Sequence, residues 1–107
     1  MRIYCAGKLN DNAVNYIKNM HRMINTANQI QELGHAVLIP CLDILAGLVA
    51  GNFEYDDYYN NNLAWLEVSD AVFVCSGWET SKGTKAEIAH AEKLGIPVYY
   101  SIEEMVK

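Results

Sequence analysis

Short apolar runs alternate along the chain with longer stretches in which apolar residues recur every three or four positions. The runs at 2–6, 36–39, 71–75 and 96–100 are mostly apolar and bounded by glycine, proline or polar residues, which is typical of buried strands. The run at 71–75 has no polar interruption, as expected of a strand covered on both faces. The pattern therefore predicts four short strands.

The stretches between these runs show the spacing of amphipathic helices. The expected helices are, in chain order, 14–33, 57–68, 84–94 and 101–107. Gly34 and Gly95 stand where two of them should end. Residues 41–57 contain glycines and aromatic residues without a clear period, and we expect a short helix followed by a flexible loop there.

Strands that alternate with helices indicate an α/β fold with a parallel sheet and right-handed crossovers. We expect one domain over residues 1–107, with a flavodoxin-like doubly wound sheet of four to five strands. The expected order is 2-1-3-4, with any fifth strand at the end, and helices on both faces. Ligands bind such sheets beyond the carboxyl ends of the strands, at the switch point between strands 1 and 3. The loops that meet there are 7–12 and 76–83.

Charge and cysteine content narrow the classes of partner. The net charge is −5 and lysine and arginine form no stripe, which argues against polymeric nucleic acid. Three cysteines without a C-x-x-C pair argue against a disulfide framework or a zinc site, and no histidine has ligand spacing. No signal peptide or membrane-spanning segment is evident. We therefore expect a cytoplasmic protein without a metal or another cofactor.

Glu87 is the first candidate for chemistry, because it follows the third strand near the start of the helix expected at 84–94. A carboxylate there could attack an electrophilic carbon or bind a sugar hydroxyl. The alternative is structural, since Thr84 and Glu87 have the spacing of a capping box, in which the glutamate returns a hydrogen bond to the helix N-terminus. The sequence pattern leaves both interpretations open.

Four further positions accompany this carboxylate. Ser81 precedes a helix N-terminus, where a hydroxyl and backbone amides could bind a phosphate. Trp78 either forms a cleft wall or covers surface. Tyr4 lies in a buried strand, and its hydroxyl needs a partner that a cleft carboxylate could supply. Asn62 shares a helix face with Leu66 and could turn inward.

Segments 4–7, 62–66, 69–74 and 81–87 together resemble the nucleoside 2-deoxyribosyltransferase superfamily, which includes the deoxynucleoside 5′-monophosphate N-glycosidases. The Gly77-Trp78-Glu79 turn is similar to that of its small bacterial and phage branch. The resemblance spans nearly the whole chain. It implies that the small-molecule partner is a nucleoside or nucleotide. It also implies a homo-oligomer, for which a dimer is the expected form.

The resemblance also implies roles for individual residues. Glu87 would be the nucleophile at the anomeric carbon, Tyr4 would orient it, and Ser81 would contact a 5′-phosphate. A glycosyl-enzyme ester would form through an oxocarbenium-like transition state and be resolved by water or a second base. The other substrate-binding positions implied are Gly7, Lys8, Leu9, Asn10, Ser76, Trp78 and Gly83.

Asn62 departs from the superfamily, because it stands where a catalytic aspartate assists the leaving base. An amide donates a hydrogen bond but cannot protonate, and loss of a general acid costs on the order of 10²- to 10⁴-fold in rate. The loop 8–12 also lacks the expected glycines and arginine. The leading hypothesis is cleavage or transfer at an N-glycosidic bond. The alternatives are a catalytically weak nucleotide-binding module and an interaction domain in which Glu87 only caps a helix.

Overall fold

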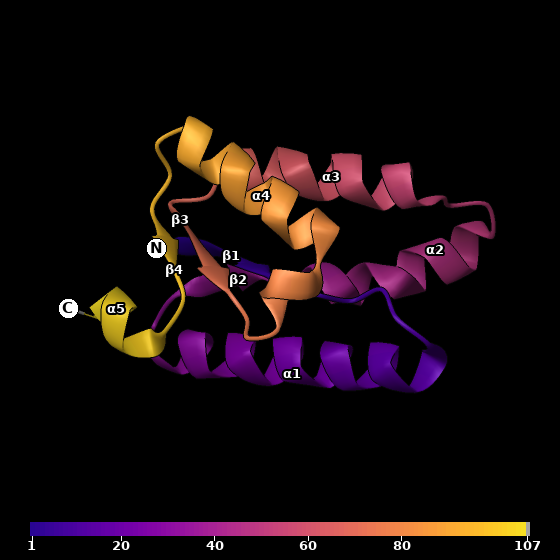
Figure 1. Cartoon of the computed structure of the whole chain (residues 1–107), viewed down its shortest axis with the longest axis horizontal. Coiled ribbons are helices and arrows are strands. Elements are labelled where there is room, and N and C mark those ends of the chain that lie inside the picture. Colours follow the sequence, from indigo (N-terminus) through magenta and orange to yellow (C-terminus); the bar gives the residue numbers. More distant parts are fainter. Residues whose placement is uncertain (107) are drawn as a thin grey trace.

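One parallel sheet of four strands lies at the centre of the chain, which a computed structural model describes from residue 1 to residue 106 (Figure 1). The strand bounds are Arg2–Ala6 (β1), Ala36–Leu38 (β2), Ala71–Val74 (β3) and Val98–Tyr99 (β4). The order is β2-β1-β3-β4, and each neighbouring pair is parallel. The predicted α/β class and the order 2-1-3-4 are therefore confirmed.

Helices cover both faces of this sheet. Their bounds are Ala13–Glu32 (α1), Ile44–Ala50 (α2), Tyr55–Glu67 (α3), Lys82–Lys93 (α4) and Ile102–Val106 (α5), with short 3-10 helices at Pro40–Asp43 (η1) and Trp78–Thr80 (η2). In Figure 1, α1 and α5 lie along one face, α3 and α4 lie along the other, and α2 extends beyond the side on which β1 ends. None of the helices in residues 1–106 is long and apolar enough to cross a membrane.

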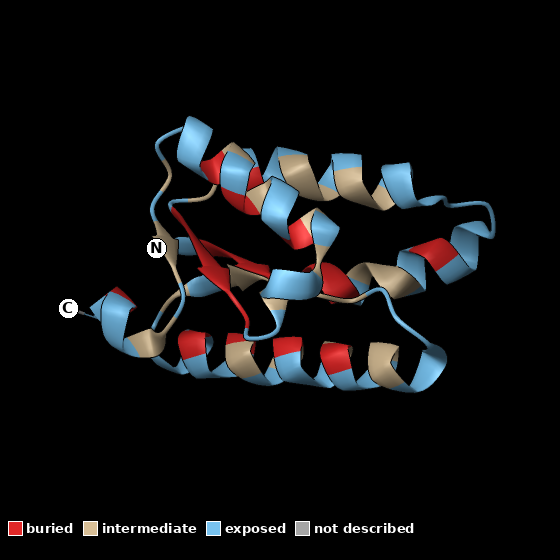
Figure 2. Cartoon of the chain, in the orientation of Figure 1, coloured by how far each residue is buried: buried red, intermediate tan, exposed pale blue. Residues whose placement is uncertain are grey.

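Alternate side chains of the central strands enter two different cores, as the period of a strand requires. Tyr4 and its cluster pack toward α3 and α4, whereas Ile3 and Cys5 belong to the clusters on the side of α1 and α5. Figure 2 shows the buried strands between the inward faces of these helices. This alternation aims the Tyr4 side chain at α4, the helix that carries Glu87.

The region predicted as a short helix and a loop, 41–57, is more ordered than its pattern indicates. Two consecutive helices, η1 and α2, fill most of it, and Gly51 ends α2 in the left-handed conformation at φ 76°. Helix α3 then begins at Tyr55, two residues earlier than predicted. The Asp57 carboxylate accepts a hydrogen bond from the Glu54 amide at 2.8 Å, and this cap fixes the start of the helix.

Candidate active site

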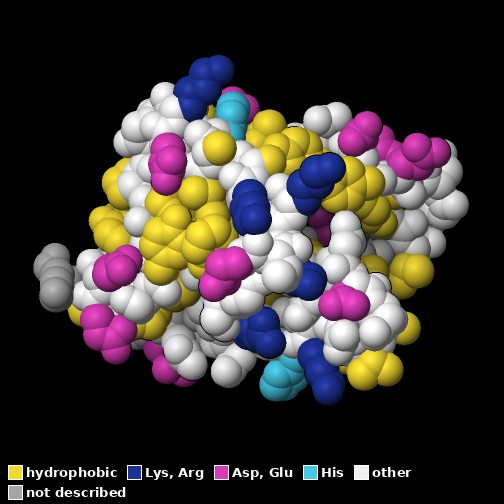
Figure 3. Space-filling model, viewed as in Figure 1, with side chains coloured by type: hydrophobic (Ala, Val, Ile, Leu, Met, Phe, Trp, Pro, Cys, Tyr) yellow, Lys and Arg dark blue, Asp and Glu magenta, His cyan; other side chains and the backbone are white. Residues whose placement is uncertain are grey.

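A cavity of about 870 Å³ opens beyond the carboxyl end of β1, where the switch point of the sheet was expected. Its walls come from β1 and the loop after it, from η1, from α3 with the residues before it, and from the start of α4. This volume lies in the range of small-molecule sites. On the face shown in Figure 3, basic side chains are interspersed with acidic and neutral ones and form no continuous stripe.

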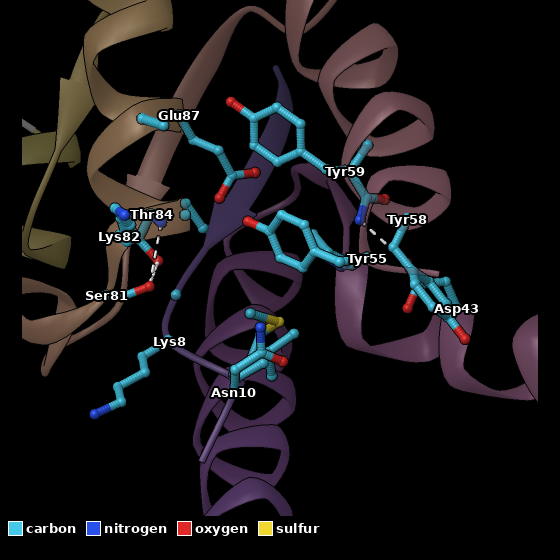
Figure 4. A pocket seen from close by; sticks show the side chains of 18 of the residues that line it. Lys8, Asn10, Asp43, Tyr55, Tyr58, Tyr59, Ser81, Lys82, Thr84 and Glu87 are labelled. Atoms are coloured by element: carbon cyan, nitrogen blue, oxygen red, sulfur yellow. Dashed lines mark hydrogen bonds between the residues drawn. The ribbon is translucent and has the colours of Figure 1, made fainter. Parts of the chain in front are cut away.

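Tyr4 and Glu87 form the polar centre of this cavity. The Tyr4 hydroxyl donates a hydrogen bond to a Glu87 carboxylate oxygen, and Tyr4 is only 1% exposed. Burial raises the pKa of Glu87 to about 7, although the Tyr4 hydrogen bond opposes part of that rise. Burial and the nearby Glu87 charge also raise the pKa of Tyr4, so that its hydroxyl stays a donor. In Figure 4 the Glu87 carboxylate points into the cavity toward Tyr55 and Tyr59.

Helix α4 begins at Lys82 because Ser81 is its N-cap. The Ser81 hydroxyl accepts a hydrogen bond from the Thr84 amide at 3.2 Å and shares a second with the Thr84 hydroxyl at 2.8 Å. Glu87 therefore lies in the second turn, beyond the free amides of the helix start. The capping-box interpretation of Thr84 and Glu87 is wrong, and the Glu87 carboxylate is instead held by Tyr4.

The loop after β1 lies along the same cavity as the start of α4. A side chain at Gly7 would approach Cys75 Cβ to 3.1 Å and Met23 Cε to 3.3 Å, so glycine lets this loop pass close to the core. The Lys8 ammonium donates to the Thr80 hydroxyl at 3.0 Å. The loop positions implied by the resemblance, Gly7, Lys8, Leu9 and Asn10, all line the cavity, as do Ser81 and Gly83. Their contact with a substrate stays a prediction.

Tyr55 and Tyr59 form an aromatic wall that the sequence analysis missed. Their rings stack with centroids 5.9 Å apart and planes 20° apart, and both line the cavity. A side chain at Gly83 would come within 2.7 Å of the Tyr55 hydroxyl, so this glycine admits the ring beside α4. The i, i+4 spacing of the two tyrosines places them on one helix face and was the available signal.

Ser76 and Trp78 are not among the described residues that line the cavity. The Trp78 ring packs against Tyr100 at a centroid distance of 5.4 Å and covers the core cluster below α4. The Ser76 side chain is exposed, and its carbonyl accepts a hydrogen bond from Arg22 at 3.1 Å. The structure thus favours a covering role for Trp78, and substrate contact by either residue stays a prediction.

Asn62 turns inward, as its helix face suggested, and meets a carboxylate from another element. Its side-chain amide donates to Asp43 Oδ2 at 3.1 Å, and both residues line the cavity. Burial raises the pKa of Asp43, and the hydrogen bond from Asn62 offsets part of the rise. Asp43 lay in the segment whose pattern was irregular, and no motif in the sequence pointed to it.

The residues that the structure describes form no evident metal-binding site. Within residues 1–106, histidine, cysteine and acidic side chains do not gather in groups of three or more that could hold a metal ion. Cys5 and Cys75 are buried, with their sulfur atoms 3.5 Å apart. The groups available for chemistry in the cavity are thus the carboxyls, the hydroxyls and amides, and Lys8 with Lys82.

Comparison with known proteins finds a family model and solved structures that resemble this chain. A family model described as Domain of unknown function (DUF4406) matches residues 1–100. A solved structure characterised as a 2-deoxyribosyltransferase from the psychrotolerant bacterium Bacillus psychrosaccharolyticus, a biocatalyst for nucleoside synthesis, matches with a TM-score of 0.67 and 25% identity. The match covers 92% of this chain and 69% of that chain. No curated protein matches the sequence. The predicted resemblance to a deoxyribosyltransferase is thus confirmed.

Proposed function

This chain belongs to the family described as Domain of unknown function (DUF4406), and we propose that it cleaves or transfers at the N-glycosidic bond of a nucleoside or nucleoside monophosphate. The Glu87 carboxylate, held by Tyr4 inside the cavity, is the observation that carries the proposal. The Glu87 carboxylate is half-buried, and with one oxygen held by a hydroxyl it keeps its other oxygen for attack on carbon. The similarity to a 2-deoxyribosyltransferase supports the same chemistry.

The proposed reaction retains configuration through two displacements. A Glu87 oxygen attacks the anomeric carbon while the carbon–nitrogen bond breaks and its electron pair leaves with the base. The Tyr4 hydroxyl keeps the carboxylate aligned during this step. Water, or the nitrogen of a second base, then attacks the same carbon and releases Glu87 as a carboxylate. Water gives a free sugar, and a second base gives a new nucleoside.

The remaining cavity walls suit the other parts of such a substrate. The stacked rings of Tyr55 and Tyr59 offer apolar faces to a base. The start of α4, with Ser81 and the nearby Lys8, offers a hydroxyl, backbone amides and a cation for a 5′-phosphate. Asp11 lies 3.7 Å from Lys8 and reduces the charge available there. Nucleosides without a phosphate therefore stay within the proposed substrate range.

A second copy of the chain is the proposed partner. Apolar side chains stand exposed along η1 and α2, with Val49 89% exposed. The members of this apolar face are Leu42, Leu45, Leu48 and Val49. Such a face is typical of an interface. We propose a homodimer through it, and a cytoplasmic location in keeping with the free thiols of Cys5, Cys41 and Cys75.

A panel of deoxynucleosides, ribonucleosides and their monophosphates tests the proposal, with released base followed by chromatography. We expect release from at least one compound and none from the same compound with Glu87→Gln. Release that survives Glu87→Gln would refute the role of this carboxylate. Release from no compound, together with a thermal shift by one nucleotide, would support the second candidate, a nucleotide-binding module. The amide of Asn62, in place of an acid, is the observation that favours that alternative.

A further inference from the structure

We propose that Asp43 is the catalytic residue that protonates the leaving base, and that Asn62 is the positioning residue that holds it. This inference rests on the proposed function. It answers the question raised by Asn62, whose amide cannot supply a proton. The two side chains come from different elements, η1 and α3, and meet only in the folded chain.

Asp43 is fixed at the cavity by its place in the fold. It is the last residue of η1, and the residues before it, Pro40 and Cys41, are buried and anchor this helix beneath the end of β2. The Asn62 amide donates to Oδ2 of Asp43 at 3.1 Å, which leaves Oδ1 without that contact. The carboxyl is half-buried and lines the same cavity as Glu87. An acid in this place is oriented before a substrate arrives.

Asp43 and Glu87 have the opposed placement that the reaction needs. In Figure 4 they lie on opposite sides of the cavity, with Tyr55 and Tyr59 between them. A retaining displacement brings the nucleophile to one face of the sugar while the base departs from the other. A sugar seated beside Glu87 therefore directs its base toward the tyrosine rings and Asp43.

The surroundings of Asp43 favour its neutral form. Burial is the largest effect on the Asp43 pKa and raises it, while the Asn62 hydrogen bond lowers it in part. The groups that feel its charge include the hydroxyls of Tyr4 and Tyr16, whose pKa values it helps to raise. None of these groups is a cation that would hold Asp43 ionised. The carboxyl thus keeps a proton more readily than an exposed aspartate does.

The proton balance of the step is complete. As Glu87 bonds to the anomeric carbon, the electron pair of the broken bond passes to the base, and the Asp43 proton is transferred to a ring nitrogen. The products are a neutral base, a glycosyl ester on Glu87 and an ionised Asp43. When water resolves the ester, its proton returns to Asp43 and the Glu87 carboxylate is regenerated. Neither step requires an oxidant or a reductant.

Leaving-group dependence separates this role from a structural one. The test compares a purine deoxynucleoside with its N7-methylated counterpart, whose base already carries a positive charge and leaves without protonation. Asp43→Asn keeps the size of the side chain and an oxygen for the Asn62 amide. We expect this variant to lose about 10²- to 10⁴-fold in base release from the unmodified compound and less than about tenfold from the methylated one. Asn62→Ala should show a smaller loss with the same selectivity.

Asp70→Asn is the matched control, because it removes a carboxylate at the opposite ends of the strands, where Asp70 pairs with Arg2. It should leave release from both compounds unchanged. Equal losses from both compounds in Asp43→Asn, or no loss from either, would overturn the role of Asp43. If the unaltered protein releases base from neither compound while Glu87→Gln behaves identically, the proposed function itself fails, and this inference falls with it.

Discussion

The hydroxyl of Tyr4 and the carboxylate of Glu87 meet in a hydrogen bond although the two residues are 83 positions apart in the chain. Strand alternation turns the Tyr4 side chain toward α4. Because α4 begins at Lys82, Glu87 lies in its second turn, where its side chain meets Tyr4. Both residues line the cavity, so the contact faces a space that a ligand can enter. It joins a buried donor that stays protonated to a carboxylate whose ionisation is delayed, which is the arrangement expected of a poised nucleophile.

Activity should rise with pH as Glu87 ionises. Burial raises its pKa to about 7, and only the carboxylate form attacks carbon. For the N7-methylated compound, whose base leaves without protonation, kcat/KM should therefore increase from pH 5 to pH 8 with a midpoint near 7. For the unmodified compound, the need for a protonated Asp43 adds a falling limb as that acid ionises. A rate limb that titrates near the ordinary glutamate pKa of 4.5 would contradict this expectation.

Stability should change with pH in the opposite direction. The folded protein binds the Glu87 proton more tightly than the unfolded chain, whose glutamate titrates near 4.5. The contribution of Glu87 to folding is therefore complete below that pH and is lost as pH rises through about 7, by up to about 3 kcal/mol. Chemical denaturation at a series of pH values measures this loss, and Glu87→Gln should flatten it. An unchanged slope in Glu87→Gln would argue against a raised pKa.

Tyr4→Phe should shift the acid limb of the pH–rate profile to higher pH. The hydroxyl lowers the pKa of Glu87, so its removal leaves burial unopposed and delays ionisation further. We also expect about a ten- to hundredfold loss at the plateau, because a hydrogen bond to a charged group is removed. A loss of rate with an unmoved limb would show that Tyr4 only fills space. Tyr59→Phe, which removes a hydroxyl from the aromatic wall, is the control that should leave the limb in place.

Ser81 combines a structural role with a proposed binding role, and two substitutions separate them. Ser81→Ala removes the N-cap and should cost about 1 kcal/mol in the free energy of unfolding. Ser81→Asp keeps a capping oxygen and should fold with little loss, but its charge should repel a 5′-phosphate. We therefore expect Ser81→Asp to raise KM for monophosphates and to leave KM for nucleosides nearly unchanged. Equal effects on both substrate classes would exclude a phosphate contact.

Self-association should depend on the apolar face of α2. Leu48→Lys, alone or with Val49→Lys, places a charge where we propose that two copies meet, and it should give a monomer in sedimentation experiments. Val68→Lys is the control, since Val68 is exposed at the end of α3 away from that face. A dimer that persists in the Leu48→Lys variant, or a monomeric parent protein, would rule out this interface.

Hydrophobic periodicity predicts most of the fold because the strands and helices are short, regular and punctuated. Alternation of elements and glycine stops were sufficient for the sheet order, whereas the start of α4 was placed too late. Ser81 and Thr84 are both residue types that cap helix N-termini well, and the η2 turn places Ser81 at the start of α4. With Thr84 as the N-cap, Glu87 would have had the capping-box position. With Ser81 as the N-cap, it does not.

Site residues were predictable where an element carries them in a regular way. Tyr4 and Glu87 follow from a strand and a helix that meet at a switch point. Asp43 does not, because η1 has no repeating pattern and the contact with Asn62 exists only after the chain has folded. Trp78 was predicted as a substrate-binding residue from its place in a candidate loop, but its ring packs against Tyr100 and does not line the cavity.

A covalent adduct on Glu87 is the most direct test of the proposed chemistry. A nucleoside with fluorine at the sugar 2-position forms the ester but hydrolyses slowly, because fluorine destabilises the oxocarbenium-like transition state of the second step. Acid quenching, proteolysis and mass spectrometry should then find one sugar on the peptide that contains Glu87, and none in Glu87→Gln. Base release without an adduct on that peptide, or with the sugar on another residue, would contradict the assignment of Glu87 as the nucleophile.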